Sequence, residues 1–342
     1  MTKKKKLLIL NTDSMDCSYG GVCPFMRHMH IWLDDAFDLS YIYLPNKWKT
    51  GGFVRIKYLL YLWINRYKFK KFDFILSHSP EGSYMASYAG VPYAHIYHGN
   101  SNPMAVSRYK VGKYLGKLWD KMFERIESTA ELLYSVGPVR NQKHKKMFNP
   151  LCQNVLPQPT DKRHGFIFAG RLESVKNIDR LIEIYSQLPK EIRQKHHFYI
   201  AGNGTLYNQL RALAHQKCLD DEVIFLGEIE NSQMMHNDAD KKILLMASTT
   251  EGFPTAIAEA FSVGVPVIST NVGDIAYIVK SGKNGILLPV NFRNEDYIDA
   301  IYTILSDYDR FSSEALAVSK VFDAKTVSLS IISDINNALK RD

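Results

Sequence analysis

The segment from Ser248 to Ile268 constrains the fold more than any other part of this 342-residue chain. The apolar run KKILLMAS leads into it and the run VPVIST leads out of it, and short uninterrupted runs of this kind are typical of buried strands in a parallel sheet. Between them, Pro254 stands where a helix would begin and Gly264 where a left-handed cap would end it. We therefore predict strand, loop, short helix and strand, the repeating unit of an α/β fold.

The loop and the helix of this unit have the pattern of an anion site with acids beside it. The amides of Thr255 and Ala256 would lie at the helix N-terminus, where phosphate groups bind. Glu251 precedes them in the loop, and Glu259 follows eight residues later in the helix. Because carboxylates accept strong hydrogen bonds from hydroxyl pairs, the pattern favours a ligand that carries both phosphates and hydroxyls, such as a sugar nucleotide. An amphipathic helix with two solvated acids is the alternative.

The sequence EGFPTAIAEAFSVGVPVIST (251–270) resembles the Glu-x7-Glu signature of retaining glycosyltransferases of family 4, which have the GT-B fold. The resemblance implies two Rossmann-like domains that face a central cleft, with the donor held mainly by the second. In that family the first Glu contacts the donor sugar and the second the ribose, so it assigns these roles to Glu251 and Glu259. The donor-binding residues expected around them are Gly252, Phe253, Pro254 and Thr255.

A second stretch, FIFAGRLESVKN (166–177), resembles the Gly-Arg-Leu…Lys-Asn motif of the same family. A buried strand would run into Gly170, and Arg171 and Lys176 would follow before an amphipathic helix. Cations at a strand end suit a departing diphosphate, because negative charge develops there during glycosyl transfer. The resemblance makes Arg171 and Lys176 the diphosphate clamp, and an ordinary surface Arg and Lys pair is the alternative.

Two glycine turns after predicted strands resemble further loops of the family. Gly202, in FYIAGNG (198–204), is expected to lie beside the nucleotide through its backbone. Gly20 and Gly21 follow the first strand, LLILN, where glycine lets the backbone approach a ligand closely. The resemblance places them near the donor phosphates and the acceptor, although a bare Gly-Gly pair is equally typical of a turn.

The first half alternates strand-like and helix-like segments, the pattern of a parallel sheet. His98 would stand at the carboxyl end of a strand in YAHIYHGN (93–100), where open α/β sheets bind ligands. The resemblance implies that His98 contacts the sugar or the leaving phosphate, and a structural histidine is the alternative. His78 has a similar place after the strand predicted at 72–79, and we rank it below His98.

The charge is unevenly divided along the chain. Residues 1–157 hold 23 Lys and Arg against 11 Asp and Glu, a charge of +12, whereas residues 158–342 hold 20 against 24, a charge of −4. Two basic stretches of the first half, 48–71 and 108–123, are also rich in Trp, Tyr and Leu, which is typical of helices on anionic membrane surfaces. Core helices with extended lysines or a single-stranded nucleic-acid surface are alternatives. No nucleic-acid motif accompanies the charge, so no nucleic-acid partner is expected.

Three prolines in NPLCQNVLPQPTDKRHG (149–165) end the alternation, and we predict the last strand of the first domain and the interdomain linker there. The expected division is an N-terminal acceptor-side domain at 1–157, a nucleotide-sugar-binding domain at 158–320, and a helix at 321–342. In the family this last helix crosses back onto the first domain.

The apolar runs and the cysteine spacing argue against a membrane-spanning or zinc-binding class. No run approaches the roughly 18 apolar residues of a spanning helix, and the apolar run after MTKKKK is too short for a signal peptide. The four cysteines (Cys17, Cys23, Cys152 and Cys218) lack CxxC spacing and a partnering His pattern, so we expect free thiols in a reducing cytoplasm. The basic first domain predicts peripheral contact with the inner face of the plasma membrane.

Together with the resemblance, these features predict a retaining glycosyltransferase without cofactor or metal. It would move a sugar from a nucleotide-diphosphate sugar, with UDP preferred from family frequency, to a glycan or lipid-linked acceptor in surface polysaccharide or glycoconjugate synthesis. The expected catalytic residues are His98, Arg171, Lys176 and Glu251. The alternatives are another GT-B enzyme, such as a sugar-nucleotide epimerase or an inverting transferase, and a non-catalytic membrane- or nucleic-acid-binding relative.

Overall fold

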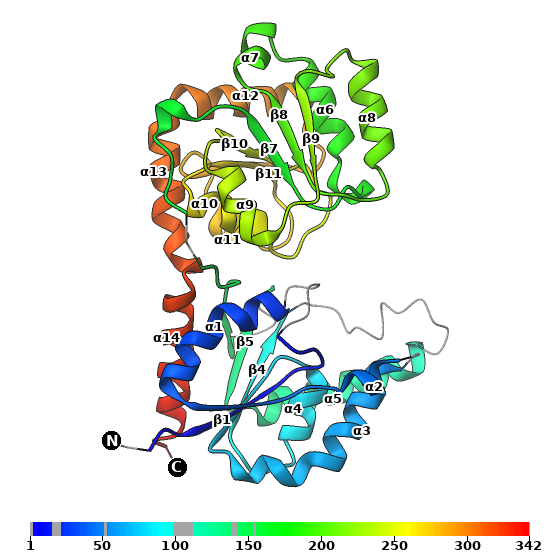
Figure 1. The fold of residues 1–342 in the computed structure, drawn as a ribbon, viewed down its shortest axis with the longest axis vertical. Helices are drawn as coiled ribbons and strands as arrows, with labels where there is room; N and C mark the ends of the chain where they lie inside the picture. Colours follow the sequence, from blue (N-terminus) through cyan, green and yellow to red (C-terminus); the bar gives the residue numbers. More distant parts are fainter. Residues whose placement is uncertain are drawn as a thin grey trace. The chain divides into compact units, whose positions relative to one another are not determined.

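The computed structural model describes residues 3–15, 22–50, 53–98, 112–137, 142–152 and 155–341. The chain divides into two units (Figure 1): unit 1 comprises Met1–Cys152 and Ala324–Asp342, and unit 2 comprises Gln153–Asp323. The first crossing between them therefore lies a few residues before the boundary expected at 157–158. The second lies a few residues after the boundary expected at 320–321.

A six-stranded parallel sheet in the order β2-β1-β3-β4-β5-β6 forms the centre of unit 1. The apolar runs KLLIL and FILS supply β1 and β3, whose residues are almost all buried, as continuous apolar runs predict. The order reverses between β1 and β3, which makes this pair the topological switch point of the sheet. The strands are β1 (Lys6–Leu10), β2 (Asp38–Ile42), β3 (Phe74–Ser77), β4 (Tyr93–Tyr97), β5 (Leu132–Ser135) and β6 (His144–Lys146).

The last strand of this sheet lies earlier in the chain than expected. The prediction of a strand within 149–165 is wrong, because β6 ends at Lys146. The predicted segment contains Pro150, Pro157 and Pro159, and proline has no N–H to donate to a strand ladder.

Helices from both ends of the chain cover the sheet of unit 1. Their bounds are α1 (Val22–Ala36), α2 (Asn46–Lys49), α3 (Val54–Asn65), the 3-10 helix η1 (Arg66–Lys71), α4 (Pro80–Ala86), α5 (Gly112–Thr129) and α14 (Ala324–Ala338). Figure 1 shows α14 running along α1, and the buried Ile331 and Ile335 of α14 share a core cluster with Met29 and Leu33 of α1.

The two basic stretches of unit 1 have different environments. In the stretch 108–123, which lies partly outside the described residues, Trp119, Met122 and Phe123 of α5 are buried in a core cluster. The membrane-surface prediction for this stretch is therefore wrong at these positions, because its apolar side chains pack inside the protein. The stretch 48–71 contains α3 and η1, and six of its large apolar side chains are exposed.

Unit 2 is built on a second six-stranded parallel sheet, in the order β12-β11-β10-β7-β8-β9. Counted from its own first strand, this is the 3-2-1-4-5-6 order of a Rossmann fold, and the order reverses between β7 and β10. Phe166, Phe168 and Phe198 of this sheet are fully buried and belong to one core cluster. The strands are β7 (Phe166–Ala169), β8 (Phe198–Ala201), β9 (Val223–Gly227), β10 (Ile243–Leu245), β11 (Val267–Thr270) and β12 (Gly285–Leu288).

The connections of unit 2 are helical, as the strand-helix alternation predicts. The α-helices are α6 (Ile178–Ser186), α7 (Lys190–Lys195), α8 (Tyr207–Gln216), α9 (Asn231–Asp238), α10 (Thr255–Ser262), α11 (Ile275–Ile278), α12 (Asn294–Ser306) and α13 (Tyr308–Val318). The 3-10 helices are η2 (Thr160–Lys162), η3 (Ser174–Lys176) and η4 (Ser319–Phe322). None of the helices in the described part of the chain is both long and apolar enough to cross a membrane.

The cysteines differ from expectation at one position. Cys152 and Cys218 form no disulfide, but Cys23 is disulfide-bonded, so the prediction of four free thiols is wrong. The partner of Cys23 lies outside the described residues. The spacing of cysteines along a chain does not determine their pairing, which depends on how closely the fold brings their Cα atoms together.

Candidate active site

Two sequence motifs meet at the switch point of unit 2. The strands β7 and β10 pair in parallel, with Phe166 opposite Ile243 and Ile167 opposite Leu244. The chain therefore leaves β7 toward Gly170 and Arg171 on the same edge of the sheet where it leaves β10 toward Glu251. In open α/β sheets ligands bind in the crevice at this place, because the connections on either side run to opposite faces of the sheet.

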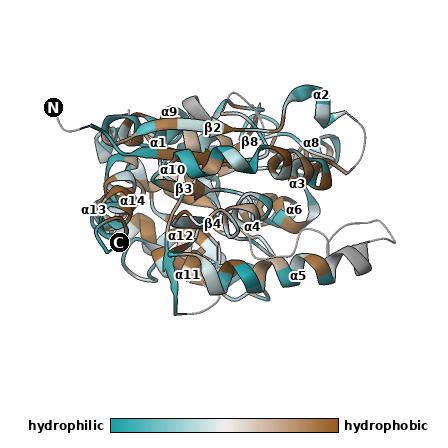
Figure 2. Cartoon of the chain, turned by 90° about the horizontal axis from the view of Figure 1, so that it is seen from below, coloured by the Kyte–Doolittle hydropathy of each residue, from teal (hydrophilic) through white to brown (hydrophobic). Residues whose placement is uncertain are grey.

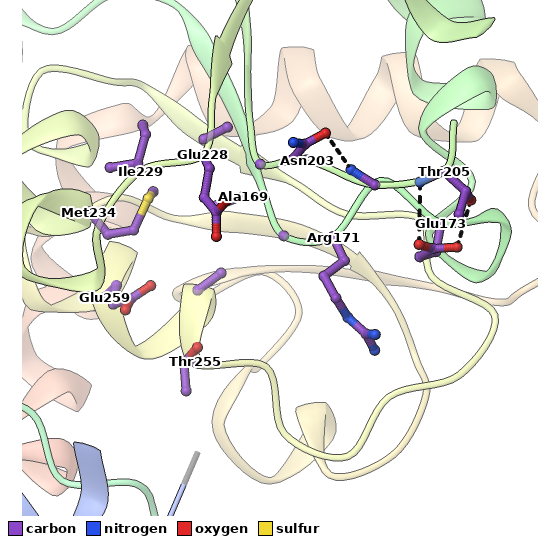
Figure 3. Close-up of a pocket in the computed structure, with 15 residues that line it drawn as sticks. Ala169, Arg171, Glu173, Asn203, Thr205, Glu228, Ile229, Met234, Thr255 and Glu259 are labelled. Atoms are coloured by element: carbon purple, nitrogen blue, oxygen red, sulfur yellow. Dashed lines mark hydrogen bonds between the residues drawn. The ribbon is translucent and has the colours of Figure 1, made fainter. Parts of the chain in front are cut away.

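A cavity of about 720 Å³ lies within unit 2 (Figure 3), a size that suits a small-molecule ligand. Five of the expected donor-binding residues line it: Gly170, Arg171, Gly202, Thr255 and Glu259. In Figure 3 the side chain of Arg171 extends from the end of β7 into the cavity, while Thr255 and Glu259 enter from α10. The other lining residues are Ala169, Glu173, Ala201, Asn203, Gly204, Thr205, Glu228, Ile229, Met234 and Ala256.

Lys176 and Glu251 lie outside this lining and pair with each other. The Lys176 Nζ and Glu251 Oε1 atoms are 2.5 Å apart, and the two side chains are only 16% and 10% exposed. The hydroxyl of Ser248 donates to the same carboxylate oxygen at 2.7 Å. Among the residues that the structure describes, none donates a hydrogen bond to Oε2 of Glu251. One oxygen of this carboxylate is thus fixed by a cation and a hydroxyl, and the other remains available to a ligand hydroxyl.

The carboxyl group of Glu259 is almost fully buried. Its residue is 7% exposed on α10, and burial raises the pKa of Glu259 to about 7. Asp238, the last residue of α9, is fully buried, and neither of its carboxyl oxygens has a hydrogen-bond partner within the described chain. Burial and then the neighbouring Glu259 carboxyl hold the pKa of Asp238 well above its usual range. Glu259 is therefore poised to change its protonation state near neutral pH.

Close backbone contacts at two glycines shape the site. Gly202 has a φ of +135°, and a Cβ there would lie 1.9 Å from the carbonyl oxygen of Gly170, so the loops after β7 and β8 can pass each other only without a side chain. Gly273, at φ +58°, allows close contact with the loop that holds Glu251, because a Cβ would lie 2.2 Å from the carbonyl oxygen of Glu251. The amide of Asp274 then donates to the carbonyl of Gly252 at 2.9 Å.

The remaining residues of the loop before α10 have other surroundings. Pro254 is the N-cap and Thr255 the first residue of α10. The ring of Phe253 stacks on Phe322 of η4, with centroids 5.6 Å apart, so a packing contact engages this side chain. Gly252 is exposed, and nothing surrounds the place of a Cβ. The donor-binding roles of Gly252 and Phe253 stay predictions.

In unit 1 the two candidate histidines form a pair at neighbouring strand ends. His78 follows β3 and His98 follows β4, and the Nδ1 atom of His78 lies 2.9 Å from the Nε2 atom of His98. Burial lowers the pKa of His98 to about 4. Burial lowers the pKa of His78 well below its usual range, and electrostatic interaction with the nearby His98 and His95 lowers it further. Both rings are therefore neutral at pH 7, and one must donate its hydrogen to the other.

Sequence reasoning ranked His78 below His98, whereas the structure joins them. It also missed Ser248 and Gly273, whose contacts with Glu251 arise only from the tertiary fold. Gly20 and Gly21 lie outside the described residues. Within the described part of the chain, no group of three or more His, Cys, Asp or Glu side chains is placed to hold a metal ion.

Comparison with known proteins agrees with this geometry. Residues 157–317, which span most of unit 2, match the family described as glycosyl transferases group 1. Unit 2 is therefore similar to the glycosyl transferases group 1 family over this range. This range includes the pair Lys176 and Glu251 and every residue that lines the cavity.

A curated relative of the glycosyl transferases group 1 domain is the phosphatidylinositol N-acetylglucosaminyltransferase gpi3 subunit of Schizosaccharomyces pombe. It is 29% identical over 161 residues, which is 46% of this chain and 34% of that protein. In eight curated relatives, the matched region spans between 30% and 42% of the length of the relative.

Solved structures resemble the whole chain. Sucrose-phosphate synthase from Thermosynechococcus elongatus matches with a TM-score of 0.75 at 13% identity, over 99% of this chain and 100% of that one. The structure of HepE from Anabaena in complex with UDP and glucose matches with a TM-score of 0.68 at 16% identity, over 97% and 100%. At these identities the likeness shows the fold, and the prediction of the GT-B fold is confirmed.

Proposed function

We propose that the protein is a retaining glycosyltransferase that transfers a sugar from a nucleotide-diphosphate sugar to an acceptor hydroxyl. One observation carries this proposal: a cavity lined by Arg171, Thr255 and Glu259 and the buried Lys176–Glu251 pair lie at the same switch point. The family match of unit 2 supports it, as does the structural relative HepE, whose complex holds UDP and glucose.

Each part of the donor has a chemical partner in unit 2. The ribose hydroxyls donate to the carboxylate of Glu259, and the buried cavity strengthens these charge-assisted bonds. The diphosphate binds at the N-terminus of α10, where the amides after Pro254 lack intrahelical acceptors, and Arg171 adds a planar cation. The free oxygen of Glu251 accepts from a hydroxyl of the donor sugar, while Lys176 and Ser248 hold the other oxygen in place.

The transfer breaks the bond between the anomeric carbon and the β-phosphate oxygen, and it forms a bond from that carbon to the acceptor oxygen. The acceptor proton moves to the leaving phosphate oxygen on the same face of the sugar, so the anomeric configuration is retained and no carboxylate acts as base. Arg171 and Lys176 stabilise the negative charge that develops on the diphosphate. Lys176 has three N–H donors, so it can remain paired with Glu251 while it contacts the phosphate.

These two cations are proposed to take the place of a metal ion, so the enzyme should not depend on one. An assay with and without EDTA checks this, and we expect equal rates. Abolition of activity by EDTA, with recovery on adding a divalent cation, would contradict the role given to Arg171 and Lys176.

UDP is the proposed donor nucleotide, because HepE was solved with UDP. A glycan or a lipid-linked compound is the proposed acceptor, because the relative from Schizosaccharomyces pombe is named for transfer to phosphatidylinositol. The net positive charge of unit 1 supports work at the inner, cytoplasmic face of a membrane. His98, positioned by His78, is proposed to contact the sugar or its leaving phosphate.

Product analysis tests the proposal. The purified protein is incubated with UDP-, GDP- and ADP-sugars and with glycan or lipid-linked acceptors, and the product is examined by NMR. We expect one donor to give a product with the anomeric configuration of the donor, and Glu251→Ala to lower turnover by about 100-fold or more with its fold intact. Inversion at the anomeric carbon, or wild-type turnover in Glu251→Ala, would refute the mechanism.

A further inference from the structure

We propose that α3 and η1 of unit 1 form a docking surface for an anionic lipid bilayer. This inference deepens the proposed function, since it names the lipid surface from which an acceptor would be taken. Only this link to an acceptor rests on the proposed function. The proposed surface, called the α3–η1 surface below, consists of Phe53, Ile56, Leu60, Trp63, Ile64 and Tyr67 together with the basic residues around them.

The apolar part of the α3–η1 surface faces away from the core. Its six large side chains are between 39% and 66% exposed. Ile56, Leu60, Trp63 and Ile64 lie on one side of α3, because Leu60 is three or four residues from each of the others. Phe53 is the N-cap of α3, and Tyr67 lies in η1. The core-facing side is separate: Tyr58 and Leu62 of α3 and Phe69 of η1 are fully buried in the cluster beneath. The helix thus has two apolar faces, and the fold covers only one of them.

The concentration of exposed apolar side chains here is unusual for the chain. Elsewhere in the described residues the exposed large hydrophobics are spread over many elements, with no more than one on any helix. Figure 2 shows α3 coloured predominantly as hydrophobic, next to the more hydrophilic α2. Single exposed apolar residues are common and need no partner, but exposing a contiguous cluster to water is unfavourable. A cluster of this kind therefore marks an interaction site.

The charges around these side chains identify the partner. Residues 39–72 contain eight Lys and Arg and no Asp or Glu. Lys47, Arg66, Lys70 and Lys71 are exposed at the ends of the surface, and the guanidinium of Arg66 lies 4.5 Å from the ring centre of Trp63. Such a surface fits anionic lipid, since Trp and Tyr favour the interface, aliphatic groups enter the acyl boundary and cations meet the phosphates.

Other macromolecules fit the same surface less well. A nucleic acid or an acidic glycan would satisfy the cations and could stack on Trp63, but it offers nothing to the aliphatic side chains Ile56, Leu60 and Ile64. A protein partner would use both chemistries only if it offered an apolar face bordered by acidic side chains, whereas an anionic bilayer presents acyl chains and phosphates everywhere on its surface. We therefore assign the surface to a bilayer, and the other partners become outcomes of the test.

The α3–η1 surface is tied to the candidate acceptor side of unit 1. Arg55 of α3 donates to the carboxylate of Glu81 at 2.8 Å, and the Glu81 side chain is fully buried in the first turn of α4. Glu81 follows closely after His78 in the same strand-end turn. A helix that docks on a bilayer would therefore hold the His78–His98 pair close to the membrane, where a lipid-linked acceptor lies.

Vesicle sedimentation of the full-length protein, without donor or acceptor, tests the proposal. Vesicles of phosphatidylcholine alone are compared with vesicles of phosphatidylcholine and phosphatidylglycerol. We expect the mixed vesicles to bind the wild type at least about tenfold more tightly, with the difference falling as salt rises. Equal binding to both kinds of vesicle, or binding to neither, would overturn the proposal.

A matched pair of variants locates the surface. Leu60→Ser with Ile64→Ser removes two exposed apolar side chains of α3 and should weaken vesicle binding by at least about tenfold. The control is Leu118→Ser with Leu329→Ser, which changes two leucines of α5 and α14 in the same unit, each 48% exposed, and should bind like the wild type. Equal losses in both double variants, or no loss in the first, would contradict the assignment.

Two further measurements separate the competing partners and the two proposals. In the first measurement, heparin or single-stranded RNA competes with vesicles for the protein. If either polyanion displaces the protein from vesicles, and if it binds the double variant Leu60→Ser with Ile64→Ser with the same affinity as the wild type, the surface binds polyanions and the lipid assignment is overturned. UDP affinity should be unchanged in both double variants. Binding of UDP, GDP or ADP without vesicle binding refutes only the docking surface, and vesicle binding without binding of any of these nucleotides refutes only the proposed function.

Discussion

Units 1 and 2 share one architecture but carry different chemistry at their switch points. Both are six-stranded parallel sheets, with the strand order reversing between β1 and β3 in one and between β7 and β10 in the other. At the second switch point lie Arg171 and the Lys176–Glu251 ion pair. At the first lies His78, paired with a second neutral histidine. The parallel sheet thus fixes where a site forms, and the side chains at the strand ends decide what it binds.

Burial acts on both sites but has opposite consequences for ligand binding. It raises the pKa of Glu259 to about 7 and lowers that of His98 to about 4, so each group is driven toward its neutral form. A ribose diol needs an ionised Glu259 as acceptor, so binding in unit 2 should be linked to pH near neutrality. The histidine pair stays neutral over the same range, and unit 1 should be insensitive to it.

The largest expected effect that distinguishes the units is the contribution of Glu259 to the pH dependence of the free energy of unfolding. The pKa of Glu259 in the folded protein, about 7, exceeds the ordinary value of 4.5, so the folded state binds the proton more tightly. Stability from this group is therefore fully present below pH 4.5 and is lost as pH rises through 7. The difference corresponds to about 3 kcal/mol, an upper estimate. Glu259→Gln should raise the free energy of unfolding at pH 8 by much of this amount and change it little at pH 5. Urea unfolding at the two pH values measures the difference.

The matching control is His98→Gln in unit 1. A histidine whose folded pKa is depressed contributes stability that is present above pH 6.5 and is lost as pH falls toward 4. This variant should therefore change the pH dependence on the acid side and leave the range from pH 7 to 8 unaffected. A gain at pH 8 in both variants, or in neither, would contradict the assigned protonation states.

The second effect concerns the diphosphate. Arg171→Ala removes the cation that enters the cavity, and we expect about 30-fold weaker UDP binding, equivalent to about 2 kcal/mol for a charge-assisted hydrogen bond. Uridine lacks the phosphates and should bind this variant as it binds the wild type. Calorimetric titration of both ligands measures the difference, and an equal loss for uridine would show that Arg171 supports the cavity rather than the phosphates.

The third effect is the pH dependence of nucleotide binding. Because only ionised Glu259 accepts both ribose hydroxyls, the Kd for UDP should rise by nearly tenfold between pH 8 and pH 6. In Glu259→Gln the affinity should be lower and should no longer depend on pH in this range. The same titration with a 2′,3′-dideoxy nucleotide provides the control, since without the diol the pH dependence should disappear in the wild type as well.

The smallest expected effect is in unit 1. Neither His78 nor His98 should take up a proton between pH 8 and pH 5, because burial keeps both rings neutral. Two-dimensional NMR of labelled histidine rings checks this, and the chemical shifts of these two rings should stay nearly constant over this range. Titration of either ring near pH 6.5 would show that the strand ends of unit 1 are open to water.

Much of this arrangement was readable in the sequence, because its signals are local. Short apolar runs specify buried parallel strands, and the motifs at 166–177 and 251–270 place Arg171, Thr255 and Glu259 at strand ends or a helix start. Parallel pairing then brings all three to one cavity. Residues whose roles follow from their own sequence neighbourhood could be predicted.

Contacts between distant segments could not be predicted in this way. The sequence motifs assigned Lys176 to a phosphate, and they contain no sign of its ion pair with Glu251 or of the Ser248 hydroxyl on the same oxygen. The need for glycine at 273 arises only where its loop meets the Glu251 backbone. The His78–His98 contact likewise depends on the adjacency of β3 and β4, and the disulfide of Cys23 on an approach that spacing does not reveal.

Calorimetric titration of the full-length protein with UDP, GDP and ADP, with Glu259→Ala beside the wild type, tests the central claim most directly. The claim is that the cavity of unit 2 holds a nucleoside diphosphate with its ribose on Glu259. We predict micromolar binding of one of these nucleotides to the wild type and its loss in Glu259→Ala. Binding of none of them to the wild type, or equal binding to the variant, would contradict the account.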